Sequence, residues 1–155
     1  MTPDLTNEVD LSSGLPVAVD AMGGDHGSKV VVKGVVEAVK EYGLSVIIVG
    51  DEAEIKTHLK KLSQLKNDKI TIAHAPDVIT MHDSPARALR KKPGASIRVA
   101  FELVKEGKAC AVVSPGNTGA MMAAGLFISG TMPGIARPAI ATVYLVLLKS
   151  IQWFF

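Results

Sequence analysis

Two short glycine-containing segments have the residue types expected of an anion-binding site. The first glycine segment, residues 20–28, reads DAMGGDHGS, and the second, residues 114–119, reads SPGNTG. Each follows a short apolar run and leads into a stretch with helical periodicity, so each would offer free backbone N–H groups and the positive end of a helix dipole. The glycines let a ligand approach the backbone closely. This combination favours binding of an anion, most simply phosphate.

The second glycine segment is the stronger candidate because its side chains add donors to those of the backbone. Ser114, Asn117 and Thr118 bring two hydroxyl groups and one amide. Asn117 has an alternative role, since asparagine is among the best residues for capping the start of a helix, and the two roles are compatible. Asp20 in the first segment could bind a metal, position a ligand or order its own loop through an Asx hydrogen bond, and we favour the last.

Several common site motifs do not occur in the sequence. The glycines of the first segment do not match G-x-G-x-x-G, and neither G-x-x-x-x-G-K-[ST] nor the hydrolase motif G-x-S-x-G is present. The four histidines lack metal-site spacing. The single cysteine, Cys110, lies in an apolar run and is expected to be an inert thiol. We therefore expect no metal and no cofactor, and we assign His26 as a further donor to the anion.

A basic stretch is the third feature with chemical potential. Its five cations fall within twelve residues that include no acid: Arg87, Arg90, Lys91, Lys92 and Arg98. For any one of them a solvated helix face is the simpler interpretation. As a group they could attract an acidic protein or a phosphorylated ligand. Ser96, just after Gly94, could cap a helix and contact an anion.

Alternation of strands and helices predicts the fold that positions these residues. The predicted strands cover residues 16–20, 45–49, 70–73 and 108–114, and the predicted helices cover 28–42, 51–62, 84–92, 96–106 and 117–128. Such spacing is typical of βαβ units, so we predict an α/β fold with a parallel sheet flanked by helices on both faces. Ligands of such sheets bind beyond the carboxyl ends of the strands, where both glycine segments lie.

Local signals predict where several helices begin and end. Ser28 has the residue type of a helix cap, and Gly43 is placed to end that helix. Asp51 with Glu54 resembles a capping box. Pro85 suits the first position of a helix.

Composition excludes several classes of protein. The chain has 155 residues, of which 48% are apolar and 21% charged, with a net charge of +2. This composition provides enough apolar surface for a core, which argues against wholesale disorder. The charge is too small to indicate nucleic-acid binding. A single cysteine permits no internal disulfide and is compatible with a reducing cytosol.

The two ends of the chain differ from its body. Residues 1–15 are predicted to be a flexible, polar extension without the features of a signal peptide. Residues 139–155 are apolar, but they are interrupted by polar residues and fall short of the ~18 to 20 apolar residues that a membrane span needs, so a transmembrane helix is not favoured. Four of the seven aromatic residues of the chain lie in the final twelve positions. This break in composition suggests that the tail does not belong to the same domain sequence as the body of the chain.

Four blocks of sequence together resemble one family. They are VAVDAMGGDHG (17–27), RKKPGASIRVA (90–100), VSPGNTGAMM (113–122) and IARP (135–138). Their order and spacing are similar to those of the bacterial phosphate acyltransferases of fatty acid and phospholipid synthesis, over residues 16–143. The resemblance implies an α/β/α fold like that of phosphate acetyltransferases and isocitrate/isopropylmalate dehydrogenases, usually as a homodimer.

The resemblance also implies an activity. Members transfer a fatty acyl group from acyl carrier protein to inorganic phosphate, which gives acyl phosphate for phospholipid synthesis. The implied partners are acyl carrier protein and phosphate, with no nucleic acid, and the implied location is the cytoplasm, with peripheral association at the inner face of the membrane. A coenzyme A-dependent phosphotransacylase and a non-catalytic fragment that binds phosphate or a partner are the alternatives.

Within the matching blocks we assign roles by inference. The catalytic candidates are Asn117, Ser114 and Thr118. The candidates for binding phosphate or substrate are Asp20, Gly23, Gly24, His26, Ser96, Arg98, Gly116 and Gly119. The candidates for docking the acidic carrier protein are Lys91 and Lys92.

The sequence departs from the family pattern in three places. Pro115 stands where members usually have alanine, and Ala95 to Arg98 differs from the usual Ser-Ser followed by Met-Arg or Leu-Arg. Members are also roughly twice as long, and residues 144–155 form an apolar tail that does not match them. We therefore expect a chain altered by truncation or frameshift, which puts its activity and dimerisation in question.

Overall fold

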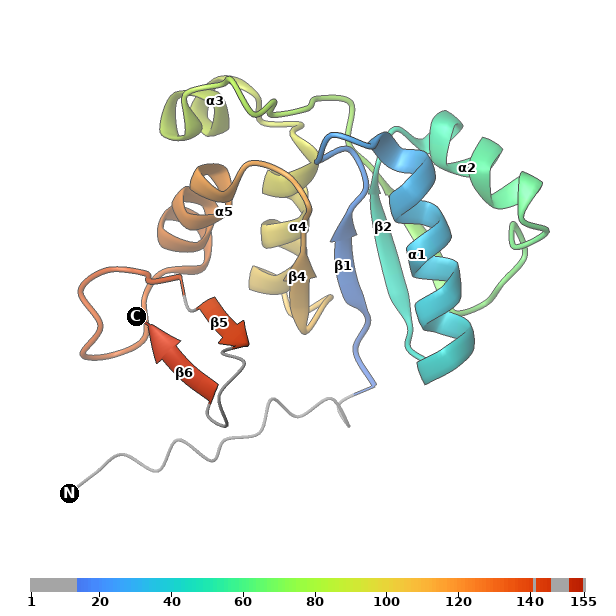
Figure 1. Cartoon of the computed structure of the whole chain (residues 1–155). Helices are drawn as coiled ribbons and strands as arrows, with labels where there is room; N and C mark the ends of the chain where they lie inside the picture. Colours follow the sequence, from blue (N-terminus) through green and yellow to red (C-terminus); the bar gives the residue numbers. More distant parts are fainter. Residues whose placement is uncertain (1–13, 141, 146–150, 155) are drawn as a thin grey trace.

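A four-stranded parallel sheet forms the centre of the chain (Figure 1). The computed structural model describes residues 14–140, 142–145 and 151–154. The strands of the sheet are β1 (Val17–Asp20), β2 (Val46–Gly50), β3 (Ile70–His74) and β4 (Ala111–Val113), in the order β3-β2-β1-β4. The helices are α1 (Gly27–Tyr42), α2 (Glu52–Lys61), α3 (Pro85–Lys91), α4 (Ser96–Lys105), α5 (Thr118–Ala124) and the π turn η2 (Gly125–Ser129). The predicted α/β class and parallel sheet are confirmed.

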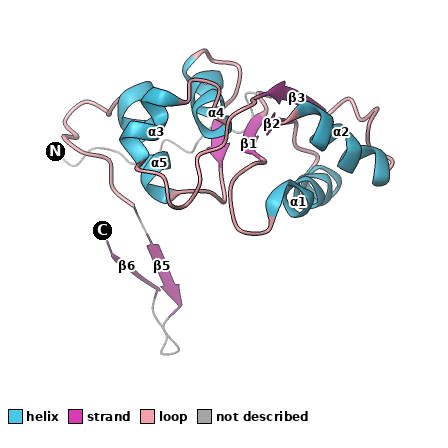
Figure 2. Cartoon of the chain, turned by 90° about the horizontal axis from the view of Figure 1, so that it is seen from above, coloured by secondary structure: helices cyan, strands magenta, loops and turns pink. Residues whose placement is uncertain are grey.

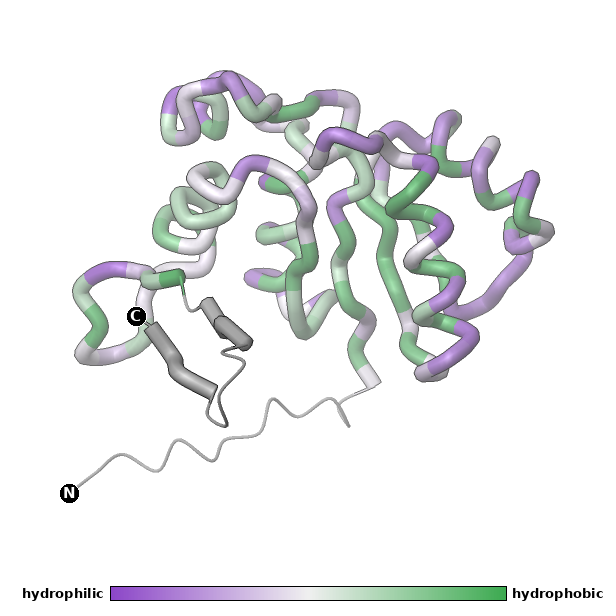
Figure 3. The backbone as a smooth tube through the Cα atoms, viewed as in Figure 1, coloured by the Kyte–Doolittle hydropathy of each residue, from purple (hydrophilic) through white to green (hydrophobic). Residues whose placement is uncertain are grey.

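Alternation along the strands explains why helices cover both faces of the sheet. Successive side chains of a strand point to opposite faces. Val19 and Ile48 pack in the cluster that α1 and α2 complete, whereas Ala18 and Val49 pack in the cluster of Ala100 from α4. Figure 2 shows α1 and α2 on one side of the strands and α4 on the other. Figure 3 shows the apolar character of the strands and of the helix stripes that meet them.

The strand order creates a switch point in the middle of the sheet. From β1 the chain passes through α1 to β2 on one side, whereas from β3 it passes through α3 and α4 to β4 on the other side of β1. β1 therefore pairs with both β2 and β4, with Val17 opposite Val46 and Ala111. Crevices at such switch points, beyond the carboxyl ends of the strands, are where open α/β sheets bind ligands.

Helices α3 and α5 and the turn η2 form a second group beside α4. Their cluster of buried residues is rich in alanine: Ile79, Ala88, Leu89, Ala95, Ile97, Ala120 and Ala124. The predicted single helix 117–128 is in fact α5 followed by a π turn, in which the N–H of Gly130 donates to the carbonyl of Gly125, five residues back, at 2.9 Å.

The helix caps confirm some local predictions and correct two. Asp51 accepts a hydrogen bond from the N–H of Glu54 at 2.8 Å, and Gly43 ends α1 with a left-handed φ of 67°. Ser28 is not a cap: α1 begins one residue earlier, and the Ser28 hydroxyl donates to the Glu54 carboxylate of α2. The hydrogen bond to Glu54 therefore replaces the capping role predicted for Ser28. The same carboxylate is thereby diverted from the reciprocal half of the capping box.

Ser96 is also not a helix cap. The cap of α4 is Ala95, and Ser96 is the first helical residue, 2% exposed. The backbone explains this, because the Ser96 N–H donates to the carbonyl of Asp77 at 3.0 Å and the Asp77 N–H donates to the carbonyl of Gly94 at 3.1 Å. This short parallel bridge, rather than a side-chain cap, fixes the start of α4.

Parts of both ends of the chain lie outside the residues that the structure describes. Of the predicted N-terminal extension, residues 1–15, the first thirteen lie outside the described residues. In the region of the predicted tail, β5 (Thr142–Leu145) and β6 (Ile151–Phe154) form an antiparallel pair. Among the described residues, no helix has the length and apolar character needed to cross a membrane.

Candidate functional site

The two glycine segments meet at the switch point between β1 and β4. A Cβ atom on Gly23 would lie 2.7 Å from the Cα and 2.8 Å from the N of Gly116, so the two backbones are in direct contact. Gly24 has a left-handed φ of 84°, and a Cβ there would lie 3.1 Å from the carbonyl oxygen of Pro115. Glycine is thus required at Gly23 by space and is favoured at Gly24 by backbone conformation.

A buried carboxylate joins the two segments. Asp20, 2% exposed, accepts the N–H of Met22 at 3.0 Å through Oδ1, which confirms the predicted Asx hydrogen bond. Its Oδ2 accepts the hydroxyl of Ser114 at 2.7 Å, and the Ser114 oxygen accepts the N–H of Gly116 at 3.0 Å. The Ser114 hydroxyl proton is therefore directed at Asp20, and both residues order the crevice from within.

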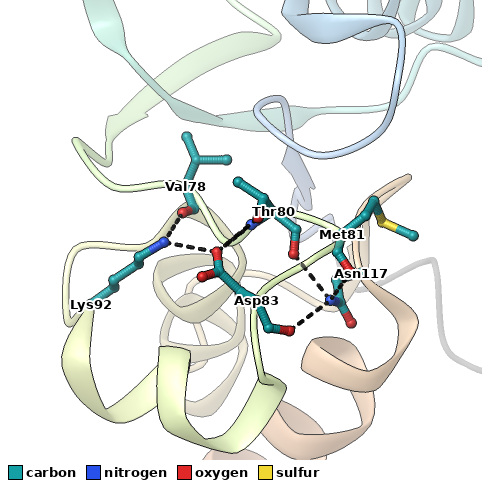
Figure 4. A network of polar contacts seen from close by, with 6 residues as sticks. All are labelled: Val78, Thr80, Met81, Asp83, Lys92 and Asn117. Carbon is teal, nitrogen blue, oxygen red and sulfur yellow. Dashed lines mark hydrogen bonds and ion pairs between the residues drawn. The ribbon is translucent and has the colours of Figure 1, made fainter.

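Asn117 connects the second glycine segment to the loop before α3 (Figure 4). Its Oδ1 accepts the N–H of Ala120 at 3.0 Å, so the predicted cap is confirmed. Its Nδ2 donates to the carbonyl oxygens of Thr80 at 3.1 Å, Met81 at 3.4 Å and Asp83 at 3.5 Å. The amide is 8% exposed and engaged at both ends, which fixes the start of α5 against residues 80–83.

An ion pair holds the same loop from its other side. The carboxylate of Asp83 accepts from Lys92 Nζ at 2.8 Å and from the N–H and hydroxyl of Thr80 at 2.8 and 3.0 Å. These bonds, that of Lys92 first, lower the pKa of Asp83 from 3.8 to about 2. Lys92 Nζ also donates to the carbonyl of Val78 at 2.8 Å. The loop is thus clamped between the end of α3 and the start of α5.

A small cavity lies between the first glycine segment and this loop. It measures about 240 Å³, and its walls include Gly24, Asp25, Thr80 and His82. This volume is below the roughly 300 to 1,000 Å³ of pockets for drug-sized ligands, so it suits a small ion better than a nucleotide. Within the described part of the chain, no group of three His, Cys, Asp or Glu side chains gathers as a metal site would require.

The structure brings together most of the predicted site residues. At the carboxyl ends of β1 and β4 the two glycine segments bring together Asp20, Gly23, Gly24, Ser114 and Gly116, and the start of α5 adds Asn117, Thr118 and Gly119. Thr118 is exposed at the first position of α5. Gly119 is packed so closely that a Cβ would lie 2.8 Å from Cγ of Pro85.

Four other predicted residues have different surroundings. Arg98 donates through Nε to Glu102 at 2.9 Å and through Nη1 to the carbonyl of Leu89 at 3.0 Å, so it faces α3 rather than the crevice. Ser96 is buried at the start of α4, and Lys92 is committed to the ion pair with Asp83. His26 is exposed at the start of α1 and makes no side-chain capping bond.

Comparison with known proteins identifies the family. The family model described as "Fatty acid synthesis protein" matches residues 15–147. The chain belongs to this family. The match includes both glycine segments, the basic stretch and the loop that Asn117 holds, so the crevice lies within the family domain.

The curated relatives carry a more specific name. Phosphate acyltransferase of Trichlorobacter lovleyi is 52% identical over 128 residues, which are 83% of this chain and 37% of the relative. Those of Methylococcus capsulatus and Lawsonia intracellularis are 48% and 47% identical over 80% and 85% of this chain. The chain spans between a third and two fifths of the length of these relatives. The expected resemblance to phosphate acyltransferases is confirmed.

Sequence reasoning missed the loop of residues 78–83 as part of the site. It contributes carbonyl groups to Asn117 and walls to the small cavity. A backbone carbonyl has no signature in residue type. The one local signal is Asp83, directly before the Ser84-Pro85 pair at the start of the predicted helix 84–92.

Proposed function

We propose that the crevice between β1 and β4 is the phosphate site of a phosphate acyltransferase, which transfers a fatty acyl group from acyl–acyl carrier protein to inorganic phosphate. The single observation that carries this proposal is the contact of the two glycine segments at the switch point, with Gly23 against Gly116. The names of the relatives support the acyltransferase chemistry.

The reaction requires little proton transfer by the protein. An oxygen of phosphate attacks the thioester carbonyl carbon, the C–S bond breaks, and the carrier thiolate leaves. Phosphate is largely dianionic near neutral pH because its second pKa is about 6 to 7, close to that of phosphate esters. The protein must position the two reactants, exclude water and stabilise the oxyanion.

Backbone N–H groups are suited to these tasks. The first turn of a helix leaves N–H groups without an intrahelical acceptor. In α5, Asn117 takes the N–H of Ala120, which leaves those of Thr118 and Gly119 to bind an anion. We assign the Thr118 hydroxyl to contact the bound phosphate. We assign Ser114 and Asn117 to catalysis as well, because their hydrogen bonds fix the geometry of the second glycine segment. Asp20 would order the crevice without touching the anion, since its oxygens are occupied.

The proposed partner is acyl carrier protein, which would dock at the basic face of α3. Lys91 is exposed there, whereas Lys92 is already paired with Asp83. Arg87, exposed on the same helix, would join Lys91 in attracting an acidic surface. A homodimer and a cytoplasmic location with peripheral membrane association remain part of the proposal.

A chemical trap tests the activity. The purified chain is mixed with long-chain acyl–acyl carrier protein and phosphate, and acyl phosphate is captured with hydroxylamine. We expect phosphate-dependent hydroxamate that falls at least about tenfold in Thr118→Val, since this change removes one hydrogen bond to a charged group and keeps the shape of the side chain.

The matched control is Thr57→Val, the same change at an exposed position of α2. Equal product from Thr118→Val and Thr57→Val would contradict the role of Thr118. A folded chain that binds phosphate and makes no hydroxamate would identify a binding fragment instead. Product that depends on coenzyme A rather than the carrier protein would identify a phosphotransacylase.

A further inference from the structure

An apolar cavity lies apart from the glycine segments, between α3, α4 and η2. It measures about 470 Å³, within the roughly 300 to 1,000 Å³ typical of small-molecule sites. Its lining consists of Ala86, Leu89, Arg90, Arg98, Phe127 and Ile128. Four of these six residues are apolar, and the other two are arginines. The cavity thus combines an apolar wall with positive charge and has no acid in its lining.

The two arginines differ in how many of their donors already form hydrogen bonds within the protein. Arg98 is held in place by Glu102 and by the carbonyl of Leu89, and its Nη2 has no bond to these partners. Arg90 is exposed, and within the described residues it has no ion pair or side-chain hydrogen bond. Because a guanidinium group has five donors and keeps its charge at all ordinary pH values, Arg90 is an available partner for a carboxylate or a phosphate.

The opposite wall of the cavity is made by the π turn. Phe127 and Ile128 belong to η2, where the hydrogen bond from Gly130 to Gly125 replaces the normal helical pattern. Phe127 is 69% exposed, so a large aromatic side chain lines the cavity without being covered by the rest of the described chain. Because η2 ends the helix that begins with α5, Phe127 and Ile128 lie on its last turn, next to α3 and α4.

We propose that this cavity binds a single-chain amphiphile with an anionic head group, either a carboxylate or a phosphate monoester. The apolar chain lies against Leu89, Phe127 and Ile128, and the head group binds Arg90 and the free edge of Arg98. This site goes beyond the proposed reaction centre, because it is built from α3, α4 and η2 and shares no residue with the glycine segments.

Calorimetric titration with three twelve-carbon probes, below their micelle concentrations and in a phosphate-free buffer, tests the proposal. Thr118→Val alters the proposed reaction centre and not this cavity, so binding that persists in that variant is separate from binding at the reaction centre. We expect dodecyl phosphate and dodecanoate to bind and dodecyltrimethylammonium not to bind. The ratio of the first two affinities identifies the preferred head group. No binding of either anion, or equal binding of the cation, would overturn the proposal.

Two variants with one matched control locate the site. Arg90→Gln removes the charge at an exposed position and should weaken anion binding about tenfold, whereas Arg87→Gln, one turn earlier on α3, should change it by less than about twofold. Ala86→Trp fills the cavity without changing charge and should abolish binding. Equal weakening by Arg87→Gln and Arg90→Gln, or undiminished binding by a folded Ala86→Trp variant, would show that general surface charge attracts the probes.

Discussion

The cluster between the sheet and α1 and α2 and the cluster among α3, α4 and α5 are packed with different kinds of side chain. The cluster under α1 and α2 is filled by branched residues: Val32, Val35, Val36, Val39, Val46, Ile48, Ile55 and Leu59. The cluster of α3, α4 and α5 has alanines at four of its seven buried positions. Valine and isoleucine side chains are restricted at χ1, whereas alanine contributes little volume and few contacts to a cluster.

The two clusters also differ in role. The cluster of α1 and α2 supports the sheet, and the region of α3, α4 and α5 carries candidate binding residues. The side of α1 and α2 fixes β1 and β2, whose carboxyl ends support the first glycine segment. The region of α3, α4 and α5 carries Asn117, the clamped loop and the cavity with the two arginines. Binding regions are commonly less densely packed than the elements that support them, since ligands need room and adjustment.

The largest expected effect compares equal substitutions in the two clusters. Ile55→Ala should lower the free energy of unfolding by about 4 kcal/mol, and Ile97→Ala by about 2 kcal/mol. Both isoleucines are at most 3% exposed, but the buried neighbours of Ile97 are mostly alanines, around which the surrounding helices can shift to close the gap. Urea unfolding of both variants measures the difference. A loss at Ile97 equal to that at Ile55 would contradict the comparison.

A pair of glycines compares the crevice with the scaffold. Gly23→Ala should lower the free energy of unfolding by about 3 kcal/mol, because the new Cβ would lie within 2.8 Å of the Gly116 backbone. Gly34→Ala, in the middle of α1 with nothing within 4 Å, should raise it by about 0.5 to 1 kcal/mol. Thermal unfolding detects both signs. A neutral Gly23→Ala would mean that the two glycine segments are not in contact in solution.

The two side-chain caps provide a third comparison. Asp51→Ala removes one capping bond from α2 and should cost about 1 kcal/mol. Asn117→Ala removes the cap of α5 and also leaves the carbonyls of Thr80 and Met81 without their donor, so it should cost about 2 kcal/mol. Denaturant titration of each variant tests this order. Should both cost the same, the contacts of Asn117 with the loop add no stability.

The smallest effect concerns the pH dependence of stability. The pKa of Asp83 is lowered from 3.8 to about 2 in the folded protein, so its ionised form stabilises the fold. This stabilisation is complete above about pH 4 and is lost as the pH falls toward 2. The Tm of the wild type should therefore fall more steeply in this window than that of Asp83→Asn. Lys92→Gln, which removes the first cause of the shift, should flatten the profile in the same way, and an unchanged slope in both variants would contradict the assignment.

Much of the fold could be predicted because its signals are local. Short apolar runs such as residues 45–49, closed by a glycine, and helix stripes such as that of Val32, Val35 and Val39 are visible in the sequence. What could not be predicted depends on partners far along the chain. Ser28 has the residue type of a cap, but Glu54, 26 residues away, takes its hydroxyl. The π turn likewise has no periodic signature in the sequence.

The candidate site was predictable in its residues more than in its contacts. The two glycine segments were singled out by glycine content and position, and the structure places them against each other. Arg98 was grouped with them because it lies near in a basic stretch, but helix geometry directs it toward Glu102, four residues on, and toward α3. The roles of these residues in binding and catalysis remain predictions.

The position of β4 in the sheet has a consequence for how the crevice is made. β1 pairs with β2 after a single helix, whereas its pairing with β4 and the bond from Ser114 to Asp20 join residues 94 positions apart. Contacts between nearby segments generally form before pairings between such distant ones, so we expect β1 to pair with β4 after it pairs with β2. The anion crevice would then be completed late in folding. Amide exchange at Gly116 would report on completion of the whole domain, while β2 and β3 are already protected.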